Sequence, residues 1–296
     1  MPEPLIILSA PRTYSSVSGS MLGQHPEAYG FPELNLFGGD TLGEAWNGIT
    51  MLFPRAHDGL LRSLAQLHEG EQTDETVARA RSWALRRFHW SIPRVFDYLQ
   101  ELIGDRFIVE KGPSLTFSPQ FLERAYKFFP NANYLHLVRH PRTTAKSLIG
   151  LRDNIVGDKI ETPKNIVDPE QLWLKCHTNA TAFGETLPTG QYMRIKGEAL
   201  MSEPHLYLPQ VCEWLGVDDS DEAIEAMLHP EVSPYACIGP ESAPYGLDPN
   251  FLKEPKLDWD RLNKISESTM DGELSWRPGD EFIKPVRKLA HQFGYV

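Results

Sequence analysis

The fold class is decided by the stretch LIILSAPRTYSS, which spans residues 5–16. Residues 5–9 begin with a short run of leucine and isoleucine, and its length and flanks predict a fully buried strand. Residues 15–23 predict a helix whose serine-rich start suits capping. A strand, a short polar loop and a helix in this order are typical of the phosphate-binding start of an α/β protein.

The rest of the chain continues this alternation. Further apolar runs predict strands at 107–109, 133–138 and 192–195. Helical patterns are found at 118–129, 141–151, 170–183, 206–215 and 280–293. Alternating strands and helices predict a parallel, doubly wound sheet with helices on both faces. Ligands in such sheets bind at the carboxyl ends of the strands.

Two kinds of segment interrupt the alternation. Residues 40–103 are predicted to be mostly helical, with a break at 70–74 and helices at 77–92 and 95–103. Residues 153–169 form a polar stretch, and residues 229–257 lack periodicity and are rich in proline and glycine. Loops of this length are usually functional, so these segments are candidates for walls of a binding site.

The charge and composition narrow the classes of partner. The 296 residues carry a formal charge of −11, which repels nucleic acid and anionic lipid, so we expect neither as a partner. The chain has no apolar run of membrane-spanning length and no basic leader, which predicts a cytoplasmic protein without membrane insertion. The three cysteines lack metal-ligand spacing and are predicted to be reduced thiols; we expect no metal site.

The loop after the first predicted strand has the chemistry of an anion site. Backbone N–H groups at the helix start, several hydroxyls and the Arg12 guanidinium converge there, and this set binds phosphate or sulfate. The Walker A pattern G-x-x-x-x-G-K-[ST] is missing, which argues against ATP or GTP hydrolysis. The alternative is an ordinary capped loop with a surface arginine.

A second candidate anion site is the run VRHPRTTAKS at 138–147. Arg139 follows a predicted strand, and Ser147 lies eight residues later on the next helix, so the two can face one anion from two sides. Nearby basic residues, in an otherwise acidic chain, are Arg142, Lys146 and Arg152. These features favour a second phosphate site, and the alternative is a solvated basic helix face.

With both motifs in this order, the chain resembles the PAPS-dependent sulfotransferases. Residues 10–16 look like the loop that binds the 5′-phosphosulfate in that family, and Arg139, Pro141 and Ser147 look like its 3′-phosphate site. Similarity extends through 110–113, 194–204 and 289–295. The resemblance is strongest to the bacterial and polysaccharide-type branch, which includes sulfotransferase domains of polyketide pathways, and whose members often carry a loop like 239–249.

The resemblance implies a fold and a reaction. The fold would be α/β, of the P-loop type, with three layers, a roughly five-stranded parallel sheet and a helical insertion, in one domain over 1–296. The 40–103 insertion would wall the acceptor site, and the 229–257 loop would cover the nucleotide. The enzyme would move the sulfuryl group of PAPS to a hydroxyl of a small organic, lipid-like or carrier-bound acceptor. Residues implied to bind the 5′-phosphosulfate are Arg12, Thr13, Tyr14, Ser15 and Ser16, and those for the 3′-phosphate are Arg139 and Ser147.

The resemblance also suggests catalytic residues. Glu33 follows a proline, as the general base does in polysaccharide-type relatives, and it lies among apolar residues. Relatives with a histidine base carry it two residues after the strand-end lysine, where this chain has Pro113. His177 is the second candidate base, although such a histidine more often has a structural role. Lys111 and Arg12 would neutralise the oxygen that leaves sulfur.

Some features depart from the family pattern or leave alternatives open. Arg12 stands where many cytosolic members have lysine, and Tyr14 replaces a small residue. His140 is predicted to support the nucleotide site, and His136 to lie inside a buried strand. Aromatic side chains of the insertion either wall an apolar acceptor pocket or pack in the core; they are Trp46, Phe53, Trp83, Phe88 and Trp90. Two other functions remain open: a nucleotide-binding module without catalysis, and a small-molecule kinase of the same fold, which the missing Walker lysine disfavours.

Overall fold

The computed structural model describes residues 2–50, 55–156, 168–257 and 268–296. Its centre is a five-stranded sheet in the order β2-β3-β1-β4-β5, and every neighbouring pair is parallel. The strands are β1 (Leu5–Ser9), β2 (Ala28–Gly30), β3 (Phe107–Lys111), β4 (Asn133–Val138) and β5 (Tyr192–Lys196). The predicted α/β class and the roughly five-stranded parallel sheet are confirmed.

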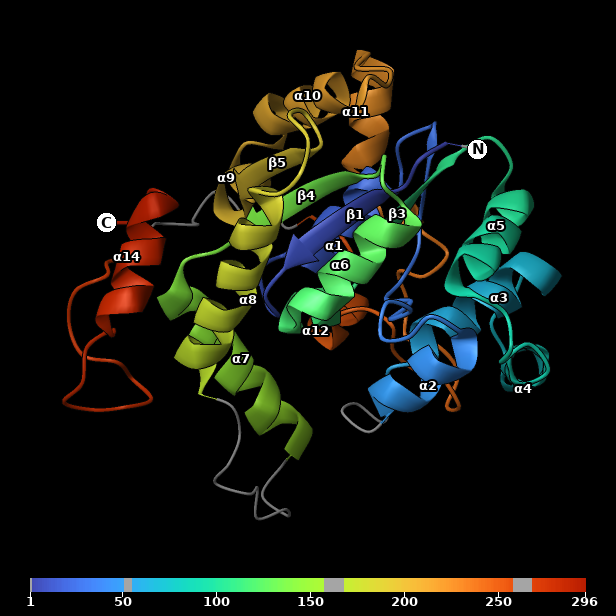
Figure 1. Cartoon of the computed structure of the whole chain (residues 1–296), viewed down its shortest axis with the longest axis horizontal. Coiled ribbons are helices and arrows are strands. Elements are labelled where there is room, and N and C mark those ends of the chain that lie inside the picture. The colour runs from blue at the N-terminus through green and yellow to red at the C-terminus, as the bar shows by residue number, and fades with distance from the viewer. Residues whose placement is uncertain (1, 51–54, 157–167, 258–267) are drawn as a thin grey trace.

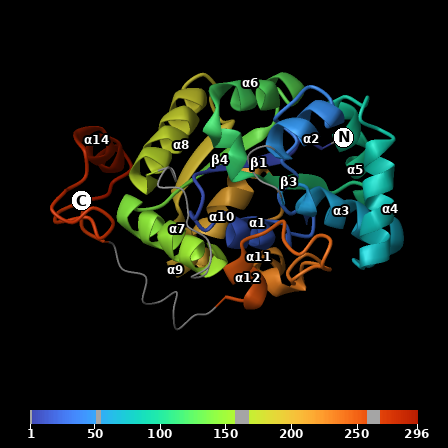
Figure 2. The same cartoon turned by 90° about the horizontal axis from the view of Figure 1, so that it is seen from below.

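Helices cover both faces of the sheet, so the protein has three layers (Figures 1 and 2). Ile6 and Leu8 of β1 face one core, together with side chains of α6 (Pro119–Phe128) and α8 (Pro169–Gly184). Leu5 and Ile7 face the opposite core. Side chains there come from α1 (Ser15–Leu22), α9 (Gly197–Ser202), α10 (Pro204–Leu215) and α11 (Asp221–Met227). Successive side chains of a strand point to opposite faces, so an apolar strand such as β1 needs both layers.

The helical insertion lies beside the β2–β3 side of the molecule (Figure 1). It contains α2 (Leu42–Thr50), α3 (Asp58–Glu69), α4 (Asp74–Leu85) and α5 (Ile92–Ile103). The predicted helix at 77–92 is too long, because the chain leaves the helix after Leu85. Residues 88–92 instead bond to 40–43: Trp90 and Phe88 accept backbone hydrogen bonds from Leu42 and Gly43. Tertiary pairing therefore overrides the helical pattern at this break.

The insertion aromatics mostly contact one another. Trp83 stacks on Tyr98 at 4.8 Å and meets Trp90 edge-on at 5.4 Å between ring centroids, and Trp46 stacks on His57 at 3.7 Å. Phe53, named above as a possible wall residue, lies outside the described residues. These contacts give the insertion its own aromatic packing, the arrangement expected of core aromatics.

The remaining elements complete the chain. They are η1 (Pro113–Phe117), α7 (Pro141–Val156), η3 (Pro230–Val232), α12 (Pro249–Lys253) and α14 (Lys284–Gln292). The sequence patterns missed β2, α9 and α11, and the 229–257 loop contains the short helices η3 and α12. Of the predicted 153–169 loop, residues 153–156 belong to α7, α8 begins at Pro169, and 157–167 lie outside the described residues. Within the described ranges, no helix combines the length and apolar character needed to cross a bilayer.

The sheet order determines which loops meet. Because all five strands are parallel, their carboxyl ends lie along one edge of the sheet. Along that edge the order is the segment after β2 with Glu33, then Lys111 at the end of β3, then the 10–14 loop after β1, then Arg139 after β4. Most of the predicted site residues therefore lie at or after the ends of four neighbouring strands, whereas the predicted base His177 lies on α8.

Candidate active site

The loop between β1 and α1 has an unusual backbone. Arg12 and Tyr14 have positive φ angles of 70° and 63°, so both are left-handed. Alternating left-handed residues turn successive backbone N–H groups toward one side, as in anion-binding nests. The Thr13 hydroxyl donates to the carbonyl of Ala10 at 2.7 Å, which braces the turn. Ser15 and Ser16 begin α1 and are buried. The loop thus offers an anion backbone N–H groups, the helix dipole and hydroxyls.

The Arg12 side chain connects this loop with α7. Its Nε donates to the Ser147 hydroxyl at 3.0 Å across 135 residues of sequence. Arg139 Nη1 donates to the carbonyl of Arg12 at 2.8 Å, and its guanidinium lies 4.2 Å from the centre of the Tyr14 ring. The two predicted anion loops therefore form one contiguous site, as the adjacency of β1 and β4 requires.

On the other side of this loop, Lys111 links two more elements. Its Nζ lies 2.6 Å from Glu33 Oε1 and donates to the Ser16 hydroxyl at 3.0 Å. The Lys111 side chain is 1% exposed and that of Glu33 is 27% exposed, so the cation is buried and the carboxylate reaches the surface. A buried ammonium needs such a partner, because an unpaired charge in the interior is strongly destabilising.

Asp248 also belongs to the site, although the sequence patterns gave it no role. Its carboxylate pairs with Arg12 at 2.5 Å, and its backbone N–H donates to the Ser16 hydroxyl at 3.0 Å. The same carboxylate caps α12 by accepting from the N–H of Asn250. Contacts therefore run without a gap from Glu33 through Lys111, Ser16, Asp248 and Arg12 to Ser147.

A buried arginine holds the loop that carries Asp248. Arg62 of α3 is 0% exposed and donates to the backbone carbonyls of Tyr245, Tyr235 and Cys237. The neighbouring Asp58 accepts from the N–H of Tyr245 at 3.1 Å. The insertion thereby fixes the 229–257 loop through α3. The periodicity of the sequence cannot predict these contacts between distant segments.

The backbone of Glu33 is clamped between α3 and the same loop. Its N–H donates to the carbonyl of Gly246 at 2.7 Å. A Cβ atom on Gly59 would lie 2.2 Å from the carbonyl oxygen of Glu33, so only glycine fits at this approach. Gly246 has a φ of 105° and its Cβ position would overlap Gly59. Three segments distant in sequence thus meet at backbone distance behind the Glu33 carboxylate.

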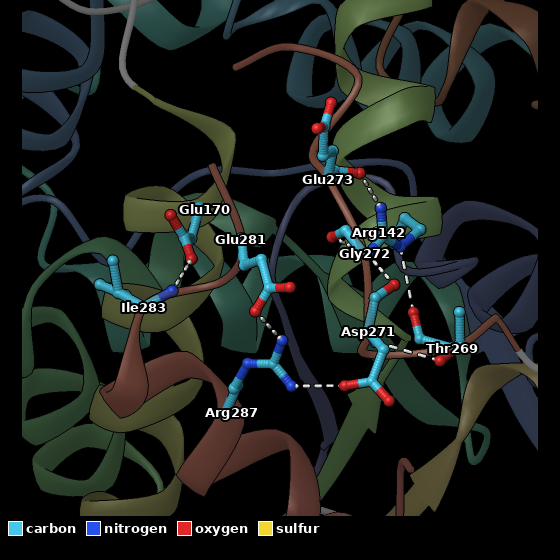
Figure 3. Close-up of polar contacts among 9 residues, drawn as sticks. All are labelled: Arg142, Glu170, Thr269, Asp271, Gly272, Glu273, Glu281, Ile283 and Arg287. Atoms are coloured by element: carbon cyan, nitrogen blue, oxygen red, sulfur yellow. Dashed lines mark hydrogen bonds and ion pairs between the residues drawn. The ribbon is translucent and has the colours of Figure 1, made fainter. Parts of the chain in front are cut away.

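Arg142 of the basic run has a structural role (Figure 3). Its guanidinium donates to the backbone carbonyls of Thr269, Asp271, Gly272 and Glu273, at 2.7–3.0 Å. These carbonyls occupy most of the guanidinium N–H donors and hold the group against the 269–273 segment, so we exclude Arg142 from the candidate phosphate ligands. Lys146 is exposed, and the side chain of Arg152 lies outside the described residues.

The carboxyl-terminal segment and α8 pack beside the loop after β4, which carries Arg139. Arg287 pairs with Asp271 and Glu281, and Glu170 accepts from the N–H of Ile283, which ties 269–296 to α8 (Figure 3). Closer to the site, the Trp173 indole N–H donates to the carbonyl of Arg139 at 2.8 Å.

His140, which was predicted to support the nucleotide site, follows Arg139 and contacts α9 and the carboxyl-terminal segment. It is buried, and its backbone N–H donates to Glu198 Oε1 at 2.8 Å. The other Glu198 oxygen accepts from the Tyr295 hydroxyl at 2.9 Å. The turn that presents Arg139 is therefore braced from both α9 and the chain end.

His177 lies apart from these contacts. It is 0% exposed, and its Nδ1 is 2.8 Å from His136 Nε2, while His136 Nδ1 is 2.6 Å from the Tyr192 hydroxyl. Burial, assisted by the charge of Arg194, lowers the pKa of His177 to about 3. An imidazole enclosed in this way cannot reach an acceptor hydroxyl, so His177 is a poor candidate for the base. The buried position predicted for His136 is observed.

The chain is similar in sequence and structure to known proteins. A sequence model of a protein family, described as the sulfotransferase family, matches residues 4–221. The chain belongs to the sulfotransferase family. The sulfotransferase domain from the curacin biosynthetic pathway is 25% identical, with a TM-score of 0.77 over 100% of this chain and 99% of that one. The sulfotransferase domain from the Synechococcus PCC 7002 olefin synthase is 27% identical, with a TM-score of 0.73 over 100% of this chain and 97% of that one. No curated protein matches.

These matches confirm the family predicted from the two anion motifs. They also confirm the P-loop-type α/β fold, since both sulfotransferase structures align with the whole of this chain. Across the described residues, no group of three or more His, Cys, Asp or Glu side chains could hold a metal ion.

Proposed function

We propose that this sulfotransferase transfers the sulfuryl group of PAPS to a hydroxyl of a small organic or lipid-like acceptor, giving a sulfate ester and 3′-phosphoadenosine 5′-phosphate (PAP). The contact of Arg12 with Ser147 carries the proposal. It brings the two candidate anion loops together, as a nucleotide with two separate anionic ends requires. The family membership supports the reaction class.

The 5′-phosphosulfate would bind at the left-handed loop, through the N–H groups and side chains of Arg12, Thr13, Tyr14, Ser15 and Ser16. The hydroxyl of Thr13 is already bonded to Ala10, so Thr13 would contribute its backbone N–H. The 3′-phosphate would bind between the Arg139 guanidinium and the Ser147 hydroxyl, one loop away. Guanidinium groups and helix N-termini are well suited to such oxyanions.

Glu33 would accept the proton of the acceptor hydroxyl, whose oxygen then attacks sulfur in line. The bond between sulfur and the oxygen of the 5′-phosphate breaks, and the electron pair stays on that oxygen. Lys111 and Arg12 would neutralise the charge that develops there. Group transfer of this kind leaves the protein mainly positioning and electrostatic work. The Lys111–Glu33 contact of 2.6 Å supports this division of roles, because it places the cation beside the base.

The rest of the chain would shape the acceptor side. We propose one domain over 1–296, in which the 40–103 insertion walls the acceptor site and the 239–249 part of the long loop covers the nucleotide. Two contacts support the proposal that this loop covers the nucleotide. Arg62 holds the loop in place, and Asp248 of the loop contacts Ser16. The acceptor hydroxyl would belong to a free small molecule or to a chain carried on a protein.

Calorimetry with PAP and turnover of PAPS over a panel of alcohols test the proposal. We expect PAP to bind and Arg139→Gln to weaken it by roughly 10- to 100-fold, the loss of a charge-assisted phosphate contact. Arg94→Gln, which removes an exposed arginine of α5, is the control and should leave PAP affinity unchanged. Tighter binding of ATP than of PAP would favour the kinase alternative. PAP binding without turnover on any alcohol would favour the non-catalytic module.

The Asp248–Arg12 pair gives a separate prediction. Its carboxylate occupies the guanidinium that the donor anion would use, so Asp248→Asn should strengthen PAP binding. We expect about a twofold to fivefold increase, as for a partly exposed ion pair worth up to about 1 kcal/mol. Asparagine still caps a helix, so α12 should persist.

Glu254→Gln is the matched control, because it removes a carboxylate from the end of the same segment without touching Arg12. Weaker PAP binding by Asp248→Asn would contradict the competition and would show that the carboxylate helps to form the site.

A further inference from the structure

Glu110 is a buried acid that the proposed reaction does not use. It precedes Lys111 at the end of β3, and its side chain is on the opposite face of the strand. The residue is 1% exposed, and neither carboxyl oxygen has a well-formed hydrogen bond to any described residue. The N–H of Leu34 lies near enough to favour the charged form slightly. An ionised carboxylate left this way would carry a large desolvation penalty.

The carboxyl faces a small pocket at the sheet edge. The pocket has a volume of about 250 Å³ when the open space at its mouth is counted. The enclosed part has room for about one water molecule. Its polar lining is Glu110, Asn35 and Ser114, and its apolar lining includes Phe37, Leu115 and Phe121. Glu110 is the only titratable side chain in this lining. The pocket therefore presents a carboxyl group with room for one hydrogen-bonding oxygen atom.

The same pocket supports the turn that carries Glu33. Asn35, two residues after Glu33, has a left-handed φ of 53°, which asparagine tolerates better than most residues. Its side chain donates to the carbonyl of Ala56 at 3.0 Å and accepts from the Ser114 hydroxyl at 2.6 Å. Asn35 thus belongs both to the wall of the pocket and to the turn that carries Glu33.

The protonation state of Glu110 sets the net charge of the group that it forms with Lys111 and Glu33. The charged groups that act on it are Lys111, which favours its ionised form, and Glu33, which opposes it. With Glu110 neutral, the Lys111–Glu33 pair carries no net charge beside the loop that would bind the anionic donor. With Glu110 ionised, the three groups carry a net charge of about −1, which repels that donor.

We propose that Glu110 is a positioning residue that is held as a neutral carboxylic acid. One water molecule bridges its carboxyl group to Asn35 and Ser114. Because Glu110 is neutral, the Lys111–Glu33 pair adds no net negative charge beside the loop that would bind the anion. The idea rests on the proposed function for the identity of the anion. Burial, the main cause, raises the pKa of Glu110 to about 8, in agreement with this state near neutral pH.

Infrared spectroscopy and melting curves test the charge state without any ligand. Wild-type protein at pH 7 should show the carbonyl stretch of a protonated carboxylic acid, and Glu110→Gln should lack it. Because the folded-state pKa lies above the ordinary value of 4.5, the contribution of Glu110 to stability is full below 4.5 and is lost as pH rises toward 8. Glu110→Gln should therefore melt several degrees above wild type at pH 8 and close to it at pH 4.5. Glu101→Gln, on the exposed side of α5, is the control and should change neither readout.

Calorimetry with PAP tests the effect on the site. Between pH 7 and pH 9 wild-type affinity should fall roughly tenfold, the effect of a unit charge at ~10 Å in an effective dielectric of ~20, and Glu110→Gln should stay flat. Identical pH profiles for the two proteins, or no acid band in the wild type, would overturn the inference. Absence of PAP binding at every pH would instead refute the proposed function, and the infrared band and melting curves would then decide the state of Glu110.

Discussion

Lys111→Met should lower kcat for sulfuryl transfer by at least about 10²-fold, with a much smaller change in KM for PAPS. The ammonium lies at the end of β3, between the Glu33 carboxylate and the hydroxyl of Ser16 in the first turn of α1. In the proposed reaction it faces an oxygen whose charge develops only as the bond to sulfur breaks. An interaction made in the transition state acts on kcat, and removing one such preorganised group typically costs 10²- to 10³-fold. Initial rates at saturating acceptor measure the effect.

Glu33→Gln separates this role from that of the base. It keeps the shape of the side chain and removes proton acceptance, so kcat should fall roughly 10²- to 10⁴-fold. Because Lys111 and Glu33 are in direct contact, the double variant should lose less than the two single losses combined. Lys288→Met, on an exposed face of α14, is the control and should keep wild-type rates. Unchanged turnover in Glu33→Gln would exclude a catalytic role for that carboxylate.

The fold was predictable where burial leaves a local pattern. The strand runs that begin at Leu5, Phe107 and Asn133 are apolar on both faces because helices cover both sides of the sheet, and such runs stand out in any sequence. β2 was missed because its three residues, Ala28–Gly30, carry no such pattern and are held by pairing with β3. The break after Leu85 was misplaced for a similar reason, since backbone bonds to 40–43 end that helix.

The convergence of the candidate site residues was predictable where they follow strands. Arg12, Lys111 and Arg139 each come at or just after the end of a strand, and a parallel sheet brings strand ends together without further information. Asp248 and Arg62 could not be found this way. Asp248 bonds to Ser16 across 232 residues, and no periodicity encodes a contact of that kind. The DP pair at 248–249 does signal a helix start, but not the cation that its carboxylate pairs with.

Arg62→Met should lower the free energy of unfolding by ~3–5 kcal/mol. The guanidinium is fully buried and satisfies three backbone carbonyls of the 235–245 segment and the side chain of Gln72. Methionine fills similar space but donates nothing, so several buried acceptors lose their partner at once, each costing about 1–3 kcal/mol before relaxation. For a chain of this size the melting temperature should fall by roughly 5–8 °C. Urea unfolding followed by circular dichroism measures the change.

The effect of Arg62→Met should extend to the site, because the segment that it releases holds Gly246 against Glu33 and, in the proposed function, covers the nucleotide. We therefore expect faster proteolysis within 235–248 and weaker PAP binding in the folded variant. Arg79→Met is the matched control, since Arg79 is exposed and pairs with Glu69 at the surface, where an ion pair contributes little. If Arg62→Met kept wild-type stability and an intact loop, the carbonyl contacts would be incidental and the Asp248 segment would be held by its own packing. A loss of stability together with a loosened loop would instead show that the helical insertion, through Arg62, holds the 235–248 segment in place.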